Sequence, residues 1–218
     1  MNYCFYVSGR ATRLYKIIKC ANENFIKKIK FVYSDSKDNE YLKEILEKKN
    51  ILYNLKDFYE LEKPDRNLKN SDNLLSLMKK NKIDYCFSFG GHILKGEILK
   101  EYKNKIINFH PSILPNYPGR NAIDKAISDN ASILGNTAHF IDEGIDTGPI
   151  ILQSVISSEA FYKYGYDFIL DLQIDMLFIL DKLLESKRIK VKGNKVRIIN
   201  ADITKSFIIP DIKGWLNE

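Results

Sequence analysis

The chain has 218 residues, which is enough for one globular domain with a substantial core. Hydrophobic residues make up 44% of it and charged residues 28%, as in ordinary soluble proteins. The net charge of +6 comes with scattered lysines, which are more typical of a solvated surface than of a site that attracts anionic ligands. No arginine-rich block or nucleic-acid motif is present, so we expect no nucleic-acid partner.

The three cysteines are Cys4, Cys20 and Cys86, and their wide spacing matches neither a zinc site nor a redox pair. Cys4 and Cys86 lie in apolar segments, where we expect them to be small buried side chains. The first residues lack the pattern of a signal peptide, and no apolar run reaches the length of a transmembrane helix. We therefore expect a cytoplasmic protein with no membrane partner.

The first half of the chain alternates between predicted strands and helices. The strands are apolar and β-prone, and the helices carry apolar residues at helical spacing. Residues 57–70 are charged and irregular and are predicted to be an exposed loop. The predicted strands are residues 2–7, 27–35, 51–55 and 83–91, and the predicted helices are residues 11–23, 39–50 and 71–82.

The second half is predicted to form a helix, two strands, a long helix and a terminal hairpin. The alternation of strand and helix indicates an α/β fold with a Rossmann-like, mostly parallel sheet and helices on both faces. We expect a single domain over residues 1–218, with a core of about 1–187 and an extension of about 188–218. The long helix and the hairpin could bury a homodimer interface or cover the sheet. These later segments are residues 119–130, 135–142, 148–157, 164–187 and 190–200.

Polar segments follow three of the predicted strands, at residues 8–13, 89–94 and 108–115. In open parallel sheets, ligands bind beyond the carboxyl ends of the strands. Asn108 and His110 lie two residues apart at such an end, so their side chains share one face of the strand. An amide and an imidazole directed at one point can stabilise a developing oxyanion and move a proton.

The turn "DEGIDTGP" adds three carboxylates, those of Asp142, Glu143 and Asp146. A carboxylate close to a histidine favours the charged imidazole and orients the ring. Acidic residues also simply favour turns, and spacing does not separate Asp142 from Asp146. His139 lies in an apolar strand and is expected to be a core residue. The chain has no His-x-x-x-His pair or clustered Cys/His set, so a metal site is a poor alternative.

The run Asn-Phe-His-Pro-Ser-Ile-Leu-Pro at residues 108–115, followed by His139 and by Asp-Thr-Gly at 146–148, resembles the folate-dependent formyltransferase family. That family includes phosphoribosylglycinamide formyltransferase, the catalytic domain of methionyl-tRNA formyltransferase, and sugar N-formyltransferases. The resemblance is clearest over about residues 87–153, and a weaker similarity covers the N-terminal half. The C-terminal 50 residues are not diagnostic.

The resemblance implies a transferase that uses N10-formyltetrahydrofolate as co-substrate and needs no metal. An acceptor amine would attack the formyl carbon. By the resemblance, the catalytic residues are Asn108, His110 and Asp146. Asn108 would donate to the tetrahedral oxyanion, a protonated His110 would stabilise the same charge, and Asp146 would support the imidazole and help remove the amine proton. His139 is implied to lie near them.

The resemblance also implies two binding regions. This chain departs from the purine-pathway members, which usually carry Arg where His92 stands and bulkier residues in place of the preceding Gly-Gly. The implied folate-binding residues are Phe89, Gly90, Gly91, His92, Ile93, Leu94, Asp142 and Glu143. The implied substrate-binding residues are Ser8, Gly9, Arg10, Thr12, Arg13, Tyr117 and His139.

Residues 8–14 stand in the place of the phosphate loop of the purine-pathway enzymes, where a helix N-terminus can bind an anion. That loop's second glycine and both asparagines are absent here, and Ser8 and Thr12 could instead cap the helix. The departure favours a nucleotide-linked amino sugar as the acceptor, as in a sugar N-formyltransferase. The alternatives are phosphoribosylglycinamide and a non-catalytic folate-binding relative. Methionyl-tRNA is disfavoured, because the chain ends before a second, basic domain.

Overall fold

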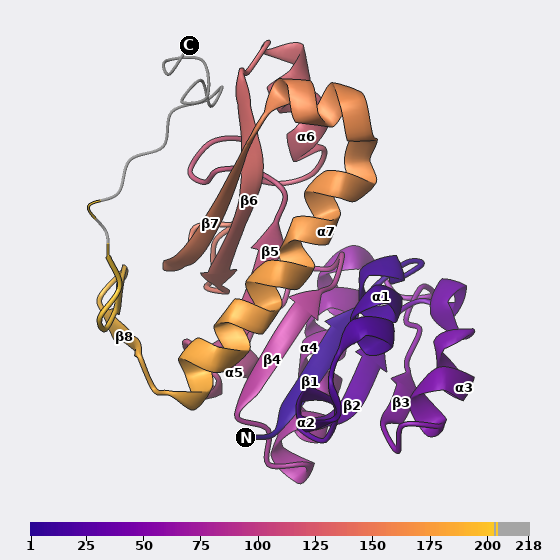
Figure 1. Cartoon of the computed structure of the whole chain (residues 1–218). Helices are drawn as coiled ribbons and strands as arrows, with labels where there is room; N and C mark the ends of the chain where they lie inside the picture. Colours follow the sequence, from indigo (N-terminus) through magenta and orange to yellow (C-terminus); the bar gives the residue numbers. More distant parts are fainter. Residues whose placement is uncertain (203, 205–218) are drawn as a thin grey trace, which may run out of the picture. The chain divides into compact units, whose positions relative to one another are not determined.

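The structure of the protein is a computed structural model that describes residues 1–202 and 204 (Figure 1). The chain divides into two compact units. The first unit contains residues 1–109 and 139–149, and the second contains residues 110–138 and the described residues from 150 onward. Each unit has its own set of strands and helices.

The first unit contains the alternating elements of the N-terminal half. In chain order they are β1 (Tyr3–Val7), α1 (Thr12–Cys20), α2 (Glu23–Ile26), β2 (Ile29–Ser34), the 3₁₀ helix η1 (Lys37–Asn39), α3 (Leu42–Glu47), β3 (Leu52–Leu55), α4 (Lys63–Lys80), β4 (Tyr85–Phe89), α5 (Glu97–Glu101) and β5 (Ile106–His110). β1 pairs in parallel with β2 and with β4, β2 pairs in parallel with β3, and β4 pairs in parallel with β5. The last residue of β5 begins the second unit.

The second unit follows the predicted order of helix, two strands, long helix and hairpin. Its elements are α6 (Ala122–Ser128), β6 (Ile133–Phe140, whose last two residues belong to the first unit), β7 (Ile150–Ser157), α7 (Ser158–Glu185), β8 (Ile189–Lys192) and β9 (Lys195–Ile198). The hydrogen-bonded strand order is β3-β2-β1-β4-β5-β6-β7, and β8 and β9 form a separate antiparallel pair. The predicted fold class is confirmed. Position 203 and positions 205–218 of the predicted extension lie outside the described residues.

The central strand β1 is buried on both faces, and Figure 1 shows it between β2 and β4. Because side chains alternate along a strand, Cys4 and Tyr6 share one face, where they pack in a cluster with Leu74 of α4. Tyr3 lies on the opposite face, and its ring centroid is 6.0 Å from that of Phe25 in α2. Helices therefore cover both faces of this part of the sheet, as predicted.

The cysteines of the two central strands behave as the sequence predicts. Cys4 and Cys86 are fully buried free thiols and face each other in the register of β1 and β4. Burial raises the pKa of Cys4 well above its ordinary value, because the thiolate would lose its hydration in an apolar core. Both side chains therefore act as small apolar core groups.

The prediction of an exposed loop over residues 57–70 is wrong for its second half, because α4 begins at Lys63. Pro64 lies in the first turn, where its missing N–H costs no helical hydrogen bond. Arg66 of this turn anchors the preceding segment, since its guanidinium donates to the carbonyls of Tyr59 (2.9 Å) and Leu61 (2.8 Å). The charged run is thus the exposed first turns of a helix.

Helix α7 also begins earlier than the predicted residues 164–187. The Ser157 side chain caps it by accepting from the N–H of Ala160 at 3.3 Å. Gly165 then interrupts the helix with a left-handed φ of 76°, which glycine adopts without steric cost. The regular helix that follows is the one that the apolar spacing predicts.

A buried polar group ties β6 to α7 in the second unit. The Asn136 side chain donates to the carbonyl of Ile169 at 2.9 Å and to Ser154 Oγ at 3.1 Å. Its oxygen accepts from Gln173 Nε2 at 2.7 Å. Asn136 and Gln173 are fully buried, so these bonds replace the water that both amides lose on folding.

We expect Asn136→Ala to lower the free energy of unfolding by about 2–3 kcal/mol, because it removes three hydrogen bonds from a buried site. Urea denaturation followed by circular dichroism measures the loss. The same substitution at the exposed Asn116 is the matched control and should change stability by less than about 0.5 kcal/mol. Equal effects of the two substitutions would contradict the role of the buried amide.

Candidate active site

Three polar side chains of the first unit meet where β5, the last residues of β6 and the turn after β6 lie side by side. Asn108 Nδ2 lies 3.2 Å from His139 Nε2 and 3.5 Å from Asp146 Oδ1. His139 Nε2 lies 3.4 Å from the same carboxylate oxygen. The amide, the imidazole and the carboxylate therefore form one cluster, although 38 residues separate the first from the last along the chain.

The structure of the turn after β6 distinguishes the roles of Asp146 and Asp142, which their spacing in the sequence does not. Asp142 accepts from the Thr147 hydroxyl at 2.7 Å and from the Gly144 N–H at 3.1 Å, so it stabilises the turn itself. Asp146 has a left-handed φ of 55° and directs its carboxylate to Asn108. Glu143 is exposed. The structure thus brings Asp146, and neither of the other two acids, into the cluster.

His139 is buried, as its apolar strand predicts, but it also orients the cluster. Its Nδ1 lies 3.0 Å from the Phe140 carbonyl, and a carbonyl only accepts, so Nδ1 carries the hydrogen. In the neutral ring Nε2 then holds a lone pair and accepts from the Asn108 amide. A primary amide nitrogen has two N–H groups, so His139 takes one of them and the other is directed at Asp146 at 3.5 Å.

His110 is the first residue of the second unit and is 5% exposed. Its Nε2 donates to the carbonyl of Tyr117 at 2.8 Å, which leaves Nδ1 as the acceptor nitrogen of the neutral ring. The Ser112 hydroxyl donates to the Asn116 carbonyl at 2.6 Å in the same loop. Tyr117 has a left-handed φ of 55° and, with Ile113, lines a cavity of about 90 Å³.

The predicted folate-binding segment after β4 divides into buried and exposed residues. Phe89 is 8% exposed, and its ring stacks on that of Phe109 with 5.0 Å between the centroids. The Arg13 guanidinium lies over the Phe89 ring, 4.7 Å from its centroid. Burial lowers the pKa of Arg13 to about 10, so the group is still charged at neutral pH. Leu94 is part of the core, whereas Ile93 is 51% exposed.

The two glycines of this segment, Gly90 and Gly91, lie close to residues of β1 and of the loop that follows it. A Cβ at Gly90 would lie 2.1 Å from Cε1 of Tyr6, so no other residue fits against that ring. The N–H of Gly91 donates to Ser8 Oγ at 2.6 Å, which ties the ends of β1 and β4 together. The Gly-Gly pair is therefore explained by packing within this unit.

The loop between β1 and α1 contradicts the predicted alternative in which Ser8 and Thr12 cap the helix. Ala11 is the N-cap of α1, with a left-handed φ of 48° and no side-chain cap, so the alternative that Ser8 or Thr12 caps the helix is wrong. Arg10 and Thr12 are exposed. Gly9 is left-handed, and a Cβ there would meet nothing within 4 Å. The start of the helix thus remains open on the side of Gly9.

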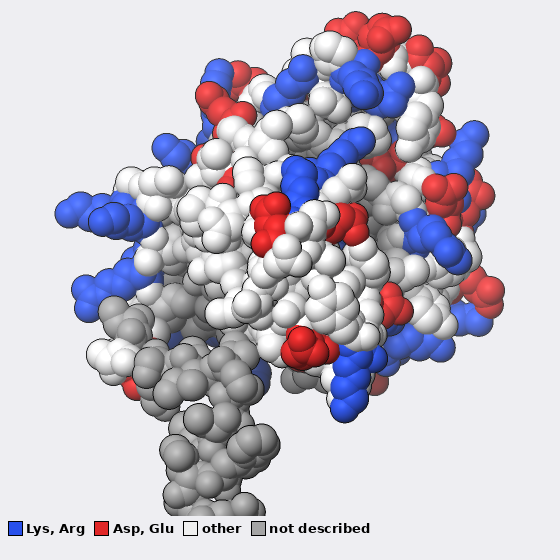
Figure 2. Space-filling view, turned by 90° about the horizontal axis from the view of Figure 1, so that it is seen from above, with Lys and Arg blue, Asp and Glu red and all other residues white. Residues whose placement is uncertain are grey.

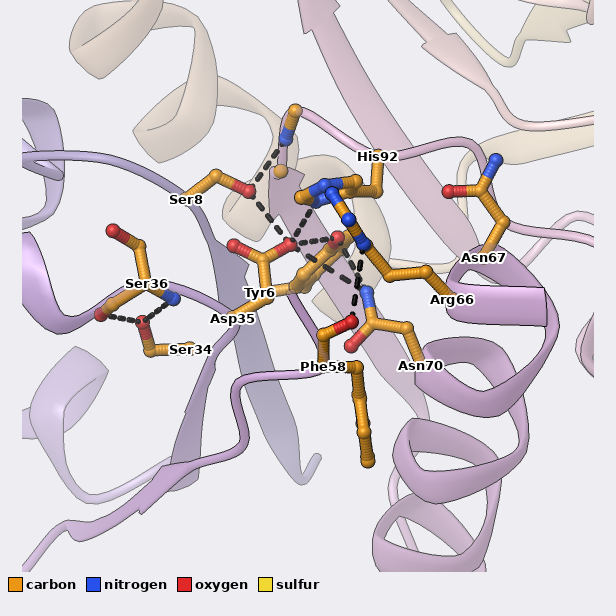
Figure 3. A network of polar contacts seen from close by, with 12 residues as sticks. Tyr6, Ser8, Ser34, Asp35, Ser36, Phe58, Arg66, Asn67, Asn70 and His92 are labelled. Carbon is orange, nitrogen blue, oxygen red and sulfur yellow. Dashed lines mark hydrogen bonds and ion pairs between the residues drawn. The ribbon is translucent and has the colours of Figure 1, made fainter. Parts of the chain in front are cut away.

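Sequence reasoning missed Asp35, the residue after β2. Its carboxylate accepts from Ser8 Oγ at 2.9 Å and from His92 Nδ1 at 2.7 Å (Figure 3). The predictions gave Ser8 to the substrate and His92 to the folate, whereas the structure joins both to one buried acid. An acidic residue at the very end of the predicted strand 27–35 was the available signal, but a single residue forms no motif.

On the face shown in Figure 2, lysine and arginine side chains are interspersed with aspartate and glutamate. No group of three His, Cys, Asp or Glu side chains within the described part of the chain could hold a metal ion. None of the described helices is both long and apolar enough to cross a membrane.

Comparison with known proteins extends these observations. A phosphoribosylglycinamide formyltransferase of Bacillus subtilis (strain 168) is 49% identical over 59 residues, which are 27% of this chain and 30% of that protein. The matched segments cover 5% to 30% of the first curated relatives. This chain is therefore similar to a limited part of each.

Two solved structures are similar over most of the chain. Glycinamide ribonucleotide transformylase 1 from Symbiobacterium toebii has a TM-score of 0.79 and 25% identity, over 91% of this chain and 93% of that chain. Formyltetrahydrofolate deformylase from Pseudomonas syringae pv. tomato has a TM-score of 0.72 over 90% of this chain and 65% of that one, and at 21% identity it shows the fold alone. A family model described as formyl transferase matches residues 1–161, well over half of the 218, and the chain belongs to that family.

Proposed function

We propose that the protein transfers the formyl group of N10-formyltetrahydrofolate to a primary amine. Membership of the formyl transferase family supports the reaction class. The observation that carries the proposal is the cluster in which Asn108 lies within 3.5 Å of both His139 and Asp146. A protein that only bound folate would have no need for an amide held beside a carboxylate in this way.

The proposed reaction begins when the amine nitrogen attacks the formyl carbon. A C–N bond forms, and the carbonyl electrons move onto oxygen. Asn108 can donate an amide N–H to this oxyanion in place of its long 3.5 Å contact with Asp146. Asp146 would accept the proton that the amine loses. The bond from the formyl carbon to N10 then breaks, and the proton passes to N10, through water where needed.

We propose that the folate contacts the segment after β4 and the turn after β6. Ile93 is half exposed and offers an apolar wall. Phe89 and Leu94 of the same segment are buried, and we propose that they support it from within the first unit. Backbone groups near Asp142 and Glu143 are the proposed hydrogen-bonding partners of the ring.

For the acceptor, we favour phosphoribosylglycinamide over the nucleotide-linked amino sugar that the sequence analysis preferred. The Bacillus subtilis relative and the Symbiobacterium toebii structure both carry that activity in their names. The open start of α1 supports a phosphate-binding role, since α1 has no side-chain cap and no acidic residue in its first turn. Thr12, Arg13 and the backbone near Gly9 are the proposed contacts.

We expect Asn108→Ala to lower kcat about 100- to 1000-fold, because it removes a donor to the oxyanion. Asp146→Asn should lower kcat about 100- to 10,000-fold, because the amide cannot accept the amine proton. Single-turnover formyl transfer, followed by release of tetrahydrofolate, measures both. Asn24→Ala, at an exposed position of α2, is the control and should leave kcat unchanged. Folded Asn108→Ala protein that turns over normally would remove the basis of the proposed function.

We expect phosphoribosylglycinamide to stabilise the protein against thermal unfolding. A ligand at 100 times its Kd adds about 2.7 kcal/mol to the free energy of unfolding, which shifts Tm by several degrees. Differential scanning fluorimetry with this acceptor and with a nucleotide-linked amino sugar compares the two candidates. Stabilisation by the sugar nucleotide alone would reverse the choice of acceptor, and release of formate without any amine would indicate hydrolysis instead.

A further inference from the structure

Asp35 is a buried carboxylate whose two oxygens differ in their hydrogen bonding. The residue is 4% exposed. Oδ2 accepts from Ser8 Oγ, His92 Nδ1 and the Tyr6 hydroxyl. Oδ1 is buried and has no hydrogen-bond partner among the residues that the structure describes. An unsatisfied acceptor on a buried charged group is costly, so Oδ1 calls for a partner beyond the residues that the structure describes.

The donors around Oδ2 are held in place by a second layer of hydrogen bonds. Asn70 Nδ2 donates to the Tyr6 hydroxyl at 2.7 Å, and Asn70 Oδ1 accepts from the Tyr33 hydroxyl at 2.6 Å. Burial and the nearby Asp35 carboxylate raise the pKa of Tyr6 well above its ordinary value, so the phenol stays a donor. The network therefore fixes the plane of the Asp35 carboxylate and, with it, the direction in which Oδ1 points.

Figure 3 shows Oδ1 pointing away from Tyr6 and His92, on the side of Asp35 that faces Ser36. Asp35 follows β2, and Ser8 follows β1, so the carboxylate lies at the edge of the sheet where ligands bind in open α/β folds. Gly9, in the neighbouring loop, has open space where a side chain would be. Oδ1 itself is buried, so a ligand group reaches it only when side chains at this edge of the first unit move aside.

We propose that Asp35 Oδ1 binds a sugar hydroxyl of the acceptor substrate. A carboxylate oxygen only accepts, so the ligand must supply a donor, and the like charge excludes a phosphate at this point. This inference rests on the proposed function, in which the acceptor's amine is used at Asn108, and sugar hydroxyls are the further donors that both candidate acceptors share. Phosphoribosylglycinamide and nucleotide-linked amino sugars both carry sugar hydroxyls, so the shared chemistry holds for either.

Binding of unreactive sugar phosphates to the full chain tests the proposal without folate or turnover. The proposed role of Asp35 can therefore fail this test while the proposed function stands. Ribose 5-phosphate should bind roughly 10- to 100-fold more tightly than tetrahydrofurfuryl phosphate, which has the same ring and phosphate but no hydroxyl, because a hydrogen bond to a charged group is lost. A nucleoside monophosphate and its 2′,3′-dideoxy form make the second pair. Preference in the first pair indicates a phosphoribosyl acceptor, and preference in the second a nucleotide.

Asp35→Asn should reduce the preference for the hydroxylated ligand, because its amide oxygen can serve the internal donors and a neutral NH₂ group then replaces the charged acceptor Oδ1. Asp38→Asn is the matched control, because it removes the same charge from an exposed position three residues away and should keep the preference. An undiminished preference in folded Asp35→Asn protein, or no preference in either pair for the unsubstituted chain, overturns the proposal.

A crystal structure with ribose 5-phosphate gives a second test that needs no substitution. A sugar hydroxyl at hydrogen-bond distance from Asp35 Oδ1, about 2.5–3.0 Å, supports the proposal. A sugar bound elsewhere, with an ordered water on Oδ1, overturns it, because the water then satisfies the buried oxygen.

Discussion

The parallel pairing of β1 with β2 and β4 is the constraint on which both polar clusters depend. Parallel strands end at the same edge of the sheet, so residues far apart in the chain become neighbours there. Ser8 and Asp35 meet across 27 residues, and His92 reaches the same carboxylate across 57. The pairing of β4 with β5, in register at Ser88 and Asn108, brings the amide of the second cluster to this edge.

Both clusters follow one physical rule: part of a polar group is used inside the protein and the rest is kept for a ligand. Asn108 donates to His139 at 3.2 Å and makes a longer contact of 3.5 Å with Asp146, which a ligand can replace. Asp35 Oδ2 accepts from four internal donors, on Tyr6, Ser8, Asn70 and His92, whereas Oδ1 has no partner among the described residues. The internal contacts hold each group rigid, so little conformational entropy remains to be lost when a ligand binds.

Much of this fold could be predicted because the strands are short apolar runs and the helices repeat apolar residues at their own period. The early start of α4 was missed because its first turns are charged on every side, and only Pro64 pointed to a helix. Asp35 was missed because its meaning comes from partners in other strands, which local patterns do not reveal. Asp142 and Asp146 have equal turn propensity, so only their hydrogen bonds distinguish them.

Gly90 lies so close to Tyr6 that even a methyl group would enter the phenol ring. That phenol donates to Asp35, so the smallest residue of the segment controls whether the carboxylate is held. A larger residue at position 90 would have to be matched by a smaller one at position 6, and the hydroxyl would then be lost. The two positions are thus free to vary only as a pair, and related chains should show them changing in step.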